Sequence, residues 1–391
     1  MSSAPRVLVI GAGAFGGWTA LELVRRGAAV TLIDAWEPGH PRASSGGETR
    51  IIRTVYGSRA IYTRLAARAL DLWRAHEARW PAGLLRATGG LWLFGPDAAF
   101  ARASAAALAA DGRAFEWLTP AEAARRYPAI DTSGISSLFF EPDAGYLFAR
   151  RACEHVAARV AAEGGRVHMG AAVAAPLHVS SSGSMTRVAL TSGATIDADA
   201  VVVACGPWLG TMCPDVMGDR IAPTRQEIYY FGTPMGDRRF DDDRMPVWIE
   251  MGERLMYGIP GNGGRGFKVA DDTPGPRFDP TGGSRELTPD GVGTARRFLR
   301  RRFPALADAP LLGGEVCQYE ATPDSHLIID AHPGAPNVWI AGGGSGHGFK
   351  MGPAIGEIVA SAVLGESQPD RTFALSRFDQ ASAELAQEKW Q

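Results

Sequence analysis

The sequence predicts an α/β protein with two domains, one built on a parallel sheet and the other on an antiparallel sheet. The chain has 391 residues, which is too many for one ordinary hydrophobic core. Residues 6–34 give strand, turn, helix and strand signals in succession, as in a βαβ unit. Residues 225–275 contain short aromatic and β-branched runs separated by Gly, Pro and Asp, as in antiparallel strands.

The N-terminal segment has the pattern of a nucleotide-binding unit. Apolar runs predict parallel strands over residues 6–10 and 29–34, and a helix is expected over residues 17–26. The turn between them has the GxGxxG spacing, whose glycines allow a tight turn, a close approach to a pyrophosphate, and packing of the helix on the strand. Its residues are Gly11, Gly13, Ala14, Phe15 and Gly16.

Asp34 ends the second strand 23 positions after Gly11. A carboxylate at this place accepts hydrogen bonds from ribose hydroxyls and disfavours a 2′-phosphate. The helix that follows the turn offers backbone N–H groups to the phosphates. The segment therefore predicts a Rossmann-type domain that binds FAD or NAD rather than NADP, and the fingerprint alone leaves the choice between FAD and NAD open.

Four further segments carry clear local signals. Apolar residues at helical spacing predict a helix over residues 61–80, and Ala-rich residues 101–110 predict another. Thr119-Pro120-Ala121-Glu122 is typical of a helix start with a capping box. Residues 166–205 alternate apolar and polar positions between SSSG and TSG turns, so we expect a β-meander that returns the chain to the parallel sheet.

The C-terminal third is expected to add a helix over residues 294–302, strands over 316–319, 327–330 and 338–341, and a helix after Gly348. Together these elements predict two domains that are discontinuous in sequence. The nucleotide-binding domain comprises residues 1–85, 145–222 and 318–391, and the substrate domain comprises residues 86–144 and 223–317.

Composition and charge argue against a nucleic-acid-binding, membrane-bound or secreted protein. The 40 Lys and Arg residues and 42 Asp and Glu residues give a net charge of −2, so no overall positive field would recruit nucleic acid or an anionic membrane. No apolar stretch approaches membrane-spanning length, and the N-terminus lacks the long apolar core of a signal peptide. The four cysteines have no CxxC spacing. We expect a cytoplasmic protein with reduced thiols and without a metal site.

Two blocks, His40–Arg53 and Cys317–Lys350, resemble the monomeric sarcosine oxidase family, within the D-amino-acid-oxidase-like flavoproteins. The likeness covers roughly the first 70 and the last 75 residues and is weak between them. The resemblance implies FAD as the cofactor and a D-amino-acid-oxidase-like fold. It also implies a small amine or amino acid as substrate, O2 as its partner, and a monomer.

The first block reads SSGGETRIIR from Ser44 to Arg53 and resembles the family pattern G-[ST]-S-x-G-x-[ST]-R-I-[IF]-R after its first glycine. The resemblance implies that Arg53 binds the substrate carboxylate and that Arg50 lies beside the flavin. We expect the two arginines to lie one turn apart on a helix. The other residues of this region assigned to the cofactor are Ser44, Ser45 and Thr49, and Val173 is assigned to it as well.

The second block begins with CQYEATPD, which resembles the family's C-x-Y-x-x-[TS]-x-D motif. The resemblance implies a thioether between Cys317 and the flavin, whereas a small buried hydrophobe is the simpler interpretation of Cys153, Cys205 and Cys213. Tyr319 falls on the same face of the expected strand as Cys317. It resembles one aromatic wall of the substrate pocket.

The block ends with a strand, a glycine-rich loop and a helix start, AGGGSGHGFK. A helix N-terminus with a nearby lysine stabilises the negative charge that a reduced flavin gathers. The resemblance assigns both flavin and substrate contacts to Lys350 and a place in the same pocket to His347. The glycines assigned to the cofactor are Gly344, Gly346 and Gly348.

Three further positions complete the expected site. Tyr257 resembles the second aromatic wall, and Lys268 resembles the lysine that activates O2 in this family. Asp272 stands where the family has a histidine beside the substrate amine. A carboxylate there could pair with a second amino group or a larger cationic amine, so sarcosine is an uncertain substrate.

The expected reaction is FAD-dependent oxidation of the C–N bond of an N-methyl, cyclic or glycated amino acid to an imine, with O2 reduced to H2O2. Four alternatives stay open: a flavin amine dehydrogenase with another acceptor, a D-amino acid oxidase or dehydrogenase, an NAD-dependent dehydrogenase, and a flavin-binding protein without catalysis.

Overall fold

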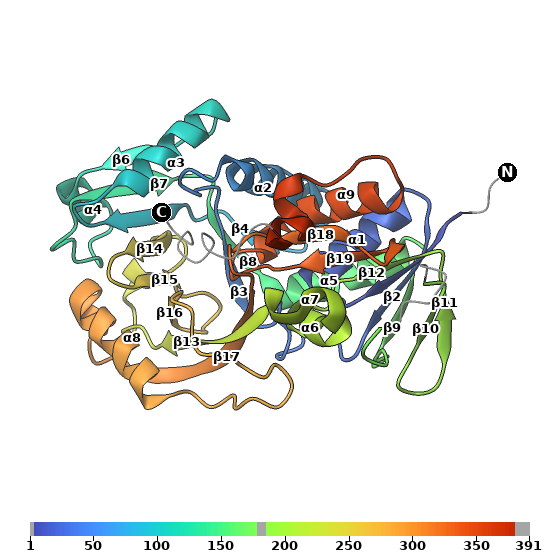
Figure 1. Cartoon of the computed structure of the whole chain (residues 1–391). Helices are drawn as coiled ribbons and strands as arrows, with labels where there is room; N and C mark the ends of the chain where they lie inside the picture. Colours follow the sequence, from blue (N-terminus) through green and yellow to red (C-terminus); the bar gives the residue numbers. More distant parts are fainter. Residues whose placement is uncertain (1–3, 178–184, 380–391) are drawn as a thin grey trace.

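The computed structural model describes residues 4–177 and 185–379. Figure 1 shows two large sheets at opposite ends of the molecule and a small third sheet between them. The expected α/β fold, with one largely parallel and one largely antiparallel sheet, is confirmed. The expected SSSG turn (residues 180–183) lies outside the described residues. Within the described ranges, no helix is long and apolar enough to cross a membrane.

The first sheet is largely parallel and has six strands in the part of the chain that the structure describes. In spatial order they are β18 (Ile328–His332), β19 (Ala335–Gly342), β12 (Ala200–Val203), β1 (Arg6–Ile10), β2 (Ala29–Asp34) and β9 (Arg166–Met169). β18 pairs antiparallel with β19, whereas the other neighbours pair in parallel. The sheet therefore joins strands from widely separated stretches of the chain.

The alternation of side chains along β1 gives this sheet two buried faces. Val7 and Val9 pack among helices α1 (Ala14–Arg25), α2 (Ala60–Arg79), α5 (Ala149–Ala162) and α9 (Gly352–Val363). Leu8 and Ile10 pack against β10 (Arg187–Ala189), β11 (Thr195–Asp197), α6 (Leu209–Met212) and α7 (Pro214–Met217). A parallel strand covered on both sides has to be apolar at every position, as this one is after Arg6.

The second sheet has eight strands in the described ranges and is antiparallel except where β14 meets β5. In spatial order they are β17 (Leu311–Ala321), β13 (Ala222–Phe231), β16 (Phe267–Asp271), β15 (Leu255–Ile259), β14 (Val247–Met251), β5 (Gly90–Phe94), β7 (Ser137–Glu141) and β6 (Glu116–Leu118). The antiparallel strands expected over residues 225–275 are therefore confirmed.

Helices also cover the second sheet. Leu91 and Leu93 of β5 share a core with α4 (Pro120–Arg126) and α8 (Pro289–Arg302), whereas Trp92 and Phe94 share another with α3 (Ala99–Ala110). α4 begins with the predicted capping box, in which Thr119 and Glu122 satisfy each other's backbone N–H groups. α8 begins at Pro289, five residues before the expected start, because Thr288 caps it.

The third sheet corrects the prediction of a helix that carries Arg50 and Arg53. Thr49–Ile52 forms strand β3, which pairs antiparallel with β8 (Gly145–Phe148), and β8 also pairs with β4 (Leu85–Arg86). The β-branched residues Thr49, Ile51 and Ile52 fit a pleated strand better than a helix. Arg50 and Arg53 are therefore not on one face of a helix.

The meander expected over residues 166–205 is also wrong in part. β9 pairs in parallel with β2, because α5 carries the chain back across the sheet before β9 begins. β10 and β11 do form an antiparallel hairpin, and β12 returns to the parallel sheet beside β1, as expected.

Candidate functional site

The turn between β1 and α1 needs glycine at its first and third fingerprint positions. Gly11 has a φ of +104°, and a Cβ added to it would lie 2.4 Å from the carbonyl oxygen of Ala204. A Cβ added to Gly16 would lie 1.9 Å from the carbonyl oxygen of Gly11. The chain therefore brings the helix start, the turn and the end of β12 closer together than any side chain would allow.

Two predicted cofactor residues hold this turn by hydrogen bonds. The Asp34 carboxylate accepts from the backbone N–H groups of Ala12, at 2.7 Å, and Trp36, at 2.9 Å. Ser45 Oγ accepts from the N–H of Ala14 at 2.9 Å. Burial raises the pKa of Asp34, and these backbone hydrogen bonds oppose that shift.

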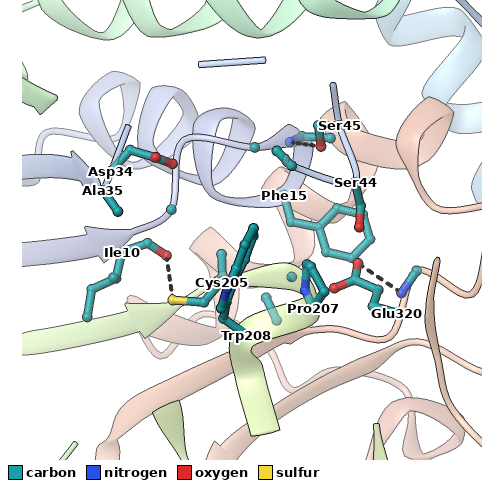
Figure 2. Close-up of a pocket in the computed structure, with 18 of the residues that line it drawn as sticks. Ile10, Phe15, Asp34, Ala35, Ser44, Ser45, Cys205, Pro207, Trp208 and Glu320 are labelled. Atoms are coloured by element: carbon teal, nitrogen blue, oxygen red, sulfur yellow. Dashed lines mark hydrogen bonds between the residues drawn. The ribbon is translucent and has the colours of Figure 1, made fainter. Parts of the chain in front are cut away.

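A first cavity opens in front of this turn and is lined by both expected and unexpected residues (Figure 2). The expected ones are Gly11, Gly13, Ala14, Phe15, Asp34, Ser44, Ser45, Arg50, Val173, Tyr319, Gly344, Gly346 and Gly348. Residues that motif reasoning missed include Trp36, Cys205, Trp208, Gln318 and Glu320. The rings of Trp36 and Trp208 lie 5.0 Å apart.

The cavity lining fits a long, hydroxyl-bearing ligand such as FAD. Among the described residues, Ser44 Oγ, Gln318 Oε1 and Glu320 Oε2 are buried without a hydrogen-bond partner. Buried polar atoms normally have partners, so three such atoms in one cavity indicate a ligand that supplies them. The N-terminus of α1 and the acidic end of β2 add a phosphate site and a ribose site.

Arg50 lies where the first cavity meets a second one, and it lines both. Its guanidinium donates to the carbonyl oxygens of Gly46, at 2.7 Å, Thr49, at 3.0 Å, and Ser44, at 3.1 Å. Tyr319, Gly346 and Phe349 line both cavities as well. The two cavities are therefore adjacent, with Arg50 fixed between them by backbone.

The second cavity contains two buried cations. Arg53 is 7% exposed and Lys350 is 5% exposed. The Arg53 guanidinium lies over the rings of Tyr56 and Trp92, at 4.3 and 5.0 Å, and donates to the carbonyl of Val55. Lys350 Nζ donates to the carbonyl of His347 at 2.8 Å. Burial, and next the Arg53 charge, lowers the pKa of Lys350 well below its usual range.

An acidic residue and two tyrosines face these cations. Tyr257, Asp272 and Tyr319 all line the second cavity. The Tyr319 hydroxyl donates to Asp272 at 2.6 Å. His347 also lines this cavity, and its Nε2 lies 3.0 Å from the carbonyl oxygen of Ser325. The cavity thus combines positive charge, one carboxylate and aromatic walls, which suits a zwitterionic ligand.

Four of the predicted site residues, Gly16, Thr49, Lys268 and Cys317, line neither of these cavities. Lys268 is 1% exposed and its Nζ donates to the carbonyl of Thr49 at 2.8 Å. Burial, and after it the Arg50 charge, lowers the pKa of Lys268 to about 7. Burial raises the pKa of the Cys317 thiol, while the Arg50 and Lys268 charges act in the opposite direction. The Arg50 charge acts on both Lys268 and Cys317, so these two residues lie close to Arg50.

The comparison with known proteins agrees with this geometry. A model of the family described as "FAD dependent oxidoreductase" matches residues 6–362. The chain belongs to the FAD-dependent oxidoreductase family.

Its relatives in this family include oxidases of N-methylated amino acids. Monomeric sarcosine oxidase of Bacillus sp. (strain B-0618) is 31% identical over 384 residues, which cover 96% of this chain and 97% of that protein. N-methyl-L-tryptophan oxidase of Salmonella heidelberg (strain SL476) is 29% identical, with 96% and 99% covered. The resemblance to monomeric sarcosine oxidases is confirmed. It extends through the middle of the chain, where motifs alone had shown little likeness.

Solved structures share the fold of this FAD-dependent oxidoreductase. The L-proline dehydrogenase from P. horikoshii has a TM-score of 0.83 at 22% identity, and the alignment covers 97% of this chain and 99% of that one. Amadoriase I from Aspergillus fumigatus, a fructosyl amine:oxygen oxidoreductase, has a TM-score of 0.80 at 21% identity, with 99% and 93% covered. At these identities the likeness concerns the fold.

Proposed function

We propose that this enzyme oxidises the C–N bond of a secondary or cyclic amino acid, with O2 as the acceptor. The substrate loses two electrons and two protons to give an imine, O2 gains them to give H2O2, and water then hydrolyses the imine. The observation that carries the proposal is the second cavity, in which Arg53 and Lys350 face Tyr257, Asp272 and Tyr319 next to the FAD-type cavity.

The substrate carboxylate would bind to Arg53 and Lys350. Arg53 is held by the rings of Tyr56 and Trp92, so little conformational entropy remains to be lost when the carboxylate binds. A carboxylate beside Lys350 would also favour the charged form of that amine, which burial alone disfavours. Fixing the carboxylate holds the C–N bond in one orientation.

The aromatic walls would exclude water and limit the freedom of the substrate. Tyr257 and Tyr319 line the cavity, and burial raises the pKa of both phenols, so both stay neutral at physiological pH. When bound, FAD supplies a two-electron acceptor beside the substrate. In its protonated form, Lys268 would stabilise the negative charge that develops on O2, because the Thr49 carbonyl fixes its Nζ in place. That negative charge would in turn favour the protonated form, which burial disfavours.

Anaerobic titration tests the reaction class. The purified enzyme, mixed without O2 with a panel of N-methyl, cyclic and glycated amino acids, is expected to lose its yellow colour with at least one of them. Bleaching by D-amino acids with primary amines alone would instead support the D-amino acid oxidase alternative. A flavoprotein that no amine bleaches would contradict catalysis of this kind.

A second measurement separates an oxidase from a dehydrogenase. O2 consumption and H2O2 formation are expected to match substrate loss one to one. Turnover that needs an artificial dye or a quinone, with little O2 uptake, would support the flavin amine dehydrogenase.

We also propose that Cys317 carries FAD covalently. The thiol is buried beside Arg50 and Lys268, whose positive charges favour the reactive thiolate against the effect of burial. Forming the thioether would replace the S–H bond and one C–H bond of the flavin's 8α-methyl group by a C–S bond, and the two electrons and two protons released would go to O2, the acceptor of the proposed reaction. Acid precipitation of the enzyme is expected to leave the yellow colour in the pellet, and Cys317→Ser is expected to release it into the supernatant. Colour in the supernatant of both proteins would contradict the link.

We also propose the division into an FAD-binding domain (residues 1–85, 145–222 and 318–391) and a substrate domain (residues 86–144 and 223–317). The division between residues 317 and 318 falls inside β17, a strand of eleven residues that pairs with β13 on both sides of the division. Limited proteolysis of the FAD-loaded enzyme is expected to cut outside β17 and β13, because cleavage favours exposed loops over paired strands.

A further inference from the structure

Glu320 is a buried carboxylate in the first cavity that the proposed reaction does not use. It lies on β17 directly after Tyr319 and is 7% exposed. Figure 2 draws it among the other residues that line the cavity. Acidic side chains are seldom buried without a partner, so a buried carboxylate at the wall of a cavity calls for a ligand or an ion pair.

Three glycines from two distant segments leave room for this carboxylate. A Cβ added to Gly344 would lie 2.9 Å from Glu320 Oε1, and one added to Gly206 would lie 3.2 Å from Oε2. A Cβ added to Gly342 would lie 3.9 Å from Oε2. Larger residues at Gly344 and Gly206 would crowd the carboxylate, so the surrounding sequence accommodates the acid.

The protein satisfies one of the two carboxylate oxygens. Oε1 accepts a hydrogen bond from the backbone N–H of Gly344 at 3.2 Å, the contact drawn in Figure 2. Among the described residues, Oε2 has no partner. Burial raises the pKa of Glu320 to about 7. A buried acceptor without a partner costs free energy, which a donor from a ligand would offset.

The position of Glu320 along the cavity indicates which part of FAD would lie next to it. The turn at Gly11 and the N-terminus of α1 suit the pyrophosphate. Arg50 and Tyr319 line the first cavity where it meets the second one, so the flavin ring would lie at that end, next to the substrate. Glu320 adjoins Tyr319 in sequence. A Cβ on its partner Gly344 would lie 3.7 Å from the ring of Phe15, in the first turn of α1. Between pyrophosphate and ring, FAD has a ribityl chain with three hydroxyl groups.

We propose that Glu320 binds FAD by accepting a hydrogen bond from a ribityl hydroxyl at Oε2, while Oε1 holds Gly344. A hydroxyl is the FAD group that suits this oxygen, because the pyrophosphate would repel a carboxylate. The role is one of cofactor binding and positioning. It does not depend on the identity of the substrate or of the electron acceptor.

The test measures reversible binding of FAD to apoprotein by quenching of protein fluorescence, in a Cys317→Ser background so that no thioether forms. Glu320→Ala is expected to weaken FAD binding about tenfold or more, as for a hydrogen bond to a charged group. Glu320→Gln, which keeps an acceptor for Gly344 and offers a donor to the hydroxyl, is expected to stay within about threefold of the parent. ADP, which lacks the ribityl chain, is expected to bind all three proteins alike.

FAD analogues that lack one ribityl hydroxyl locate the contact. At least one of the 2′-, 3′- and 4′-deoxy analogues is expected to bind the parent about tenfold more weakly than FAD, and Glu320→Ala is expected to bind that analogue and FAD equally. The proposal is overturned if Glu320→Ala binds FAD like the parent, if it weakens ADP as much as FAD, or if each analogue loses the same affinity in both proteins.

Discussion

Lys268 combines three properties at the scale of a single residue: deep burial, a fixed partner and a neighbouring cation. Its Nζ is held by the Thr49 carbonyl at 2.8 Å, and Arg50 lies close enough to lower its pKa. Such a lysine is expensive to keep in a fold unless its charge is used. This cost favours a function for Lys268 over a purely structural place in β16.

We predict that Lys268→Met slows the reaction of the reduced enzyme with O2 by about 10²–10³-fold, the usual loss when one preorganised electrostatic group is removed. Turnover with an artificial acceptor should change less than about threefold, because substrate oxidation does not involve this charge. Stopped-flow mixing of reduced enzyme with O2 measures the first rate. Arg102→Met, at an exposed position of α3 that lines neither cavity, is the control and should behave as wild type. Equal losses with both acceptors would contradict the assignment.

Asp272 gives the second prediction for a single residue. If its carboxylate pairs with a cationic side chain of the substrate, wild type should prefer α-N-methyl-lysine to α-N-methyl-norleucine, which lacks the second amino group. Asp272→Asn should reduce that preference about tenfold or more, since a charged hydrogen bond is lost. The ratio of the two kcat/KM values measures it. An equal loss for both substrates would place Asp272 at the reacting amine instead.

Motifs predicted most of the candidate residues because the two short blocks lie at the cavities themselves. Glu320 was not predicted, although it belongs to the same block as Cys317 and Tyr319. Its surroundings include Gly206, Gly342 and Gly344, which the fold brings to it from two segments distant from each other in sequence. No local pattern contains that information.

At the scale of the element, β3 is a strand where the local sequence had predicted a helix. Arg50 and Arg53 have the spacing of a helix, yet the segment pairs with β8 along its whole length. The backbone hydrogen bonds of β3 come from a strand almost a hundred residues later in the chain, so spacing alone could not decide. The βαβ unit was predictable because its contacts are local.

We predict that Gly16→Ala disrupts the start of α1. The new Cβ would lie 1.9 Å from the Gly11 carbonyl oxygen, so the backbone of the turn must move. The expected cost is about 1–3 kcal/mol of stability, with the flavin content of the purified protein reduced several-fold. The ratio of flavin to protein absorbance and the thermal unfolding midpoint measure both effects.

Gly95→Ala is the matched control, because a Cβ there meets no atom within 4 Å. It should keep full flavin content and an unchanged midpoint. Normal flavin content in Gly16→Ala would show that the turn tolerates a side chain and would contradict the geometric argument.

At the scale of the whole molecule, the first sheet takes β1, β12 and β19 from the two ends and the middle of the chain. Their parallel order was partly predictable, since apolar runs buried on both faces belong to parallel sheets. The place of β9 beside β2 was not, because the run at residues 166–169 looks like any short strand. Fold assembly here depends on contacts between distant segments.

The same arrangement links the stability of the whole fold to FAD. The first cavity draws its lining from β1, β2, β17 and the loop after β19, so a bound cofactor joins segments that would separate on unfolding. A ligand that binds only the folded state stabilises it by mass action, about 1.4 kcal/mol for each tenfold excess over Kd.

In Cys317→Ser, where binding is reversible, the unfolding midpoint should therefore rise with every tenfold increase in added FAD. In wild type a covalent cofactor is already at saturation, so added FAD should leave the midpoint unchanged. A midpoint that rises equally in both proteins would contradict the thioether, and one that rises in neither would contradict the assignment of this cavity to FAD.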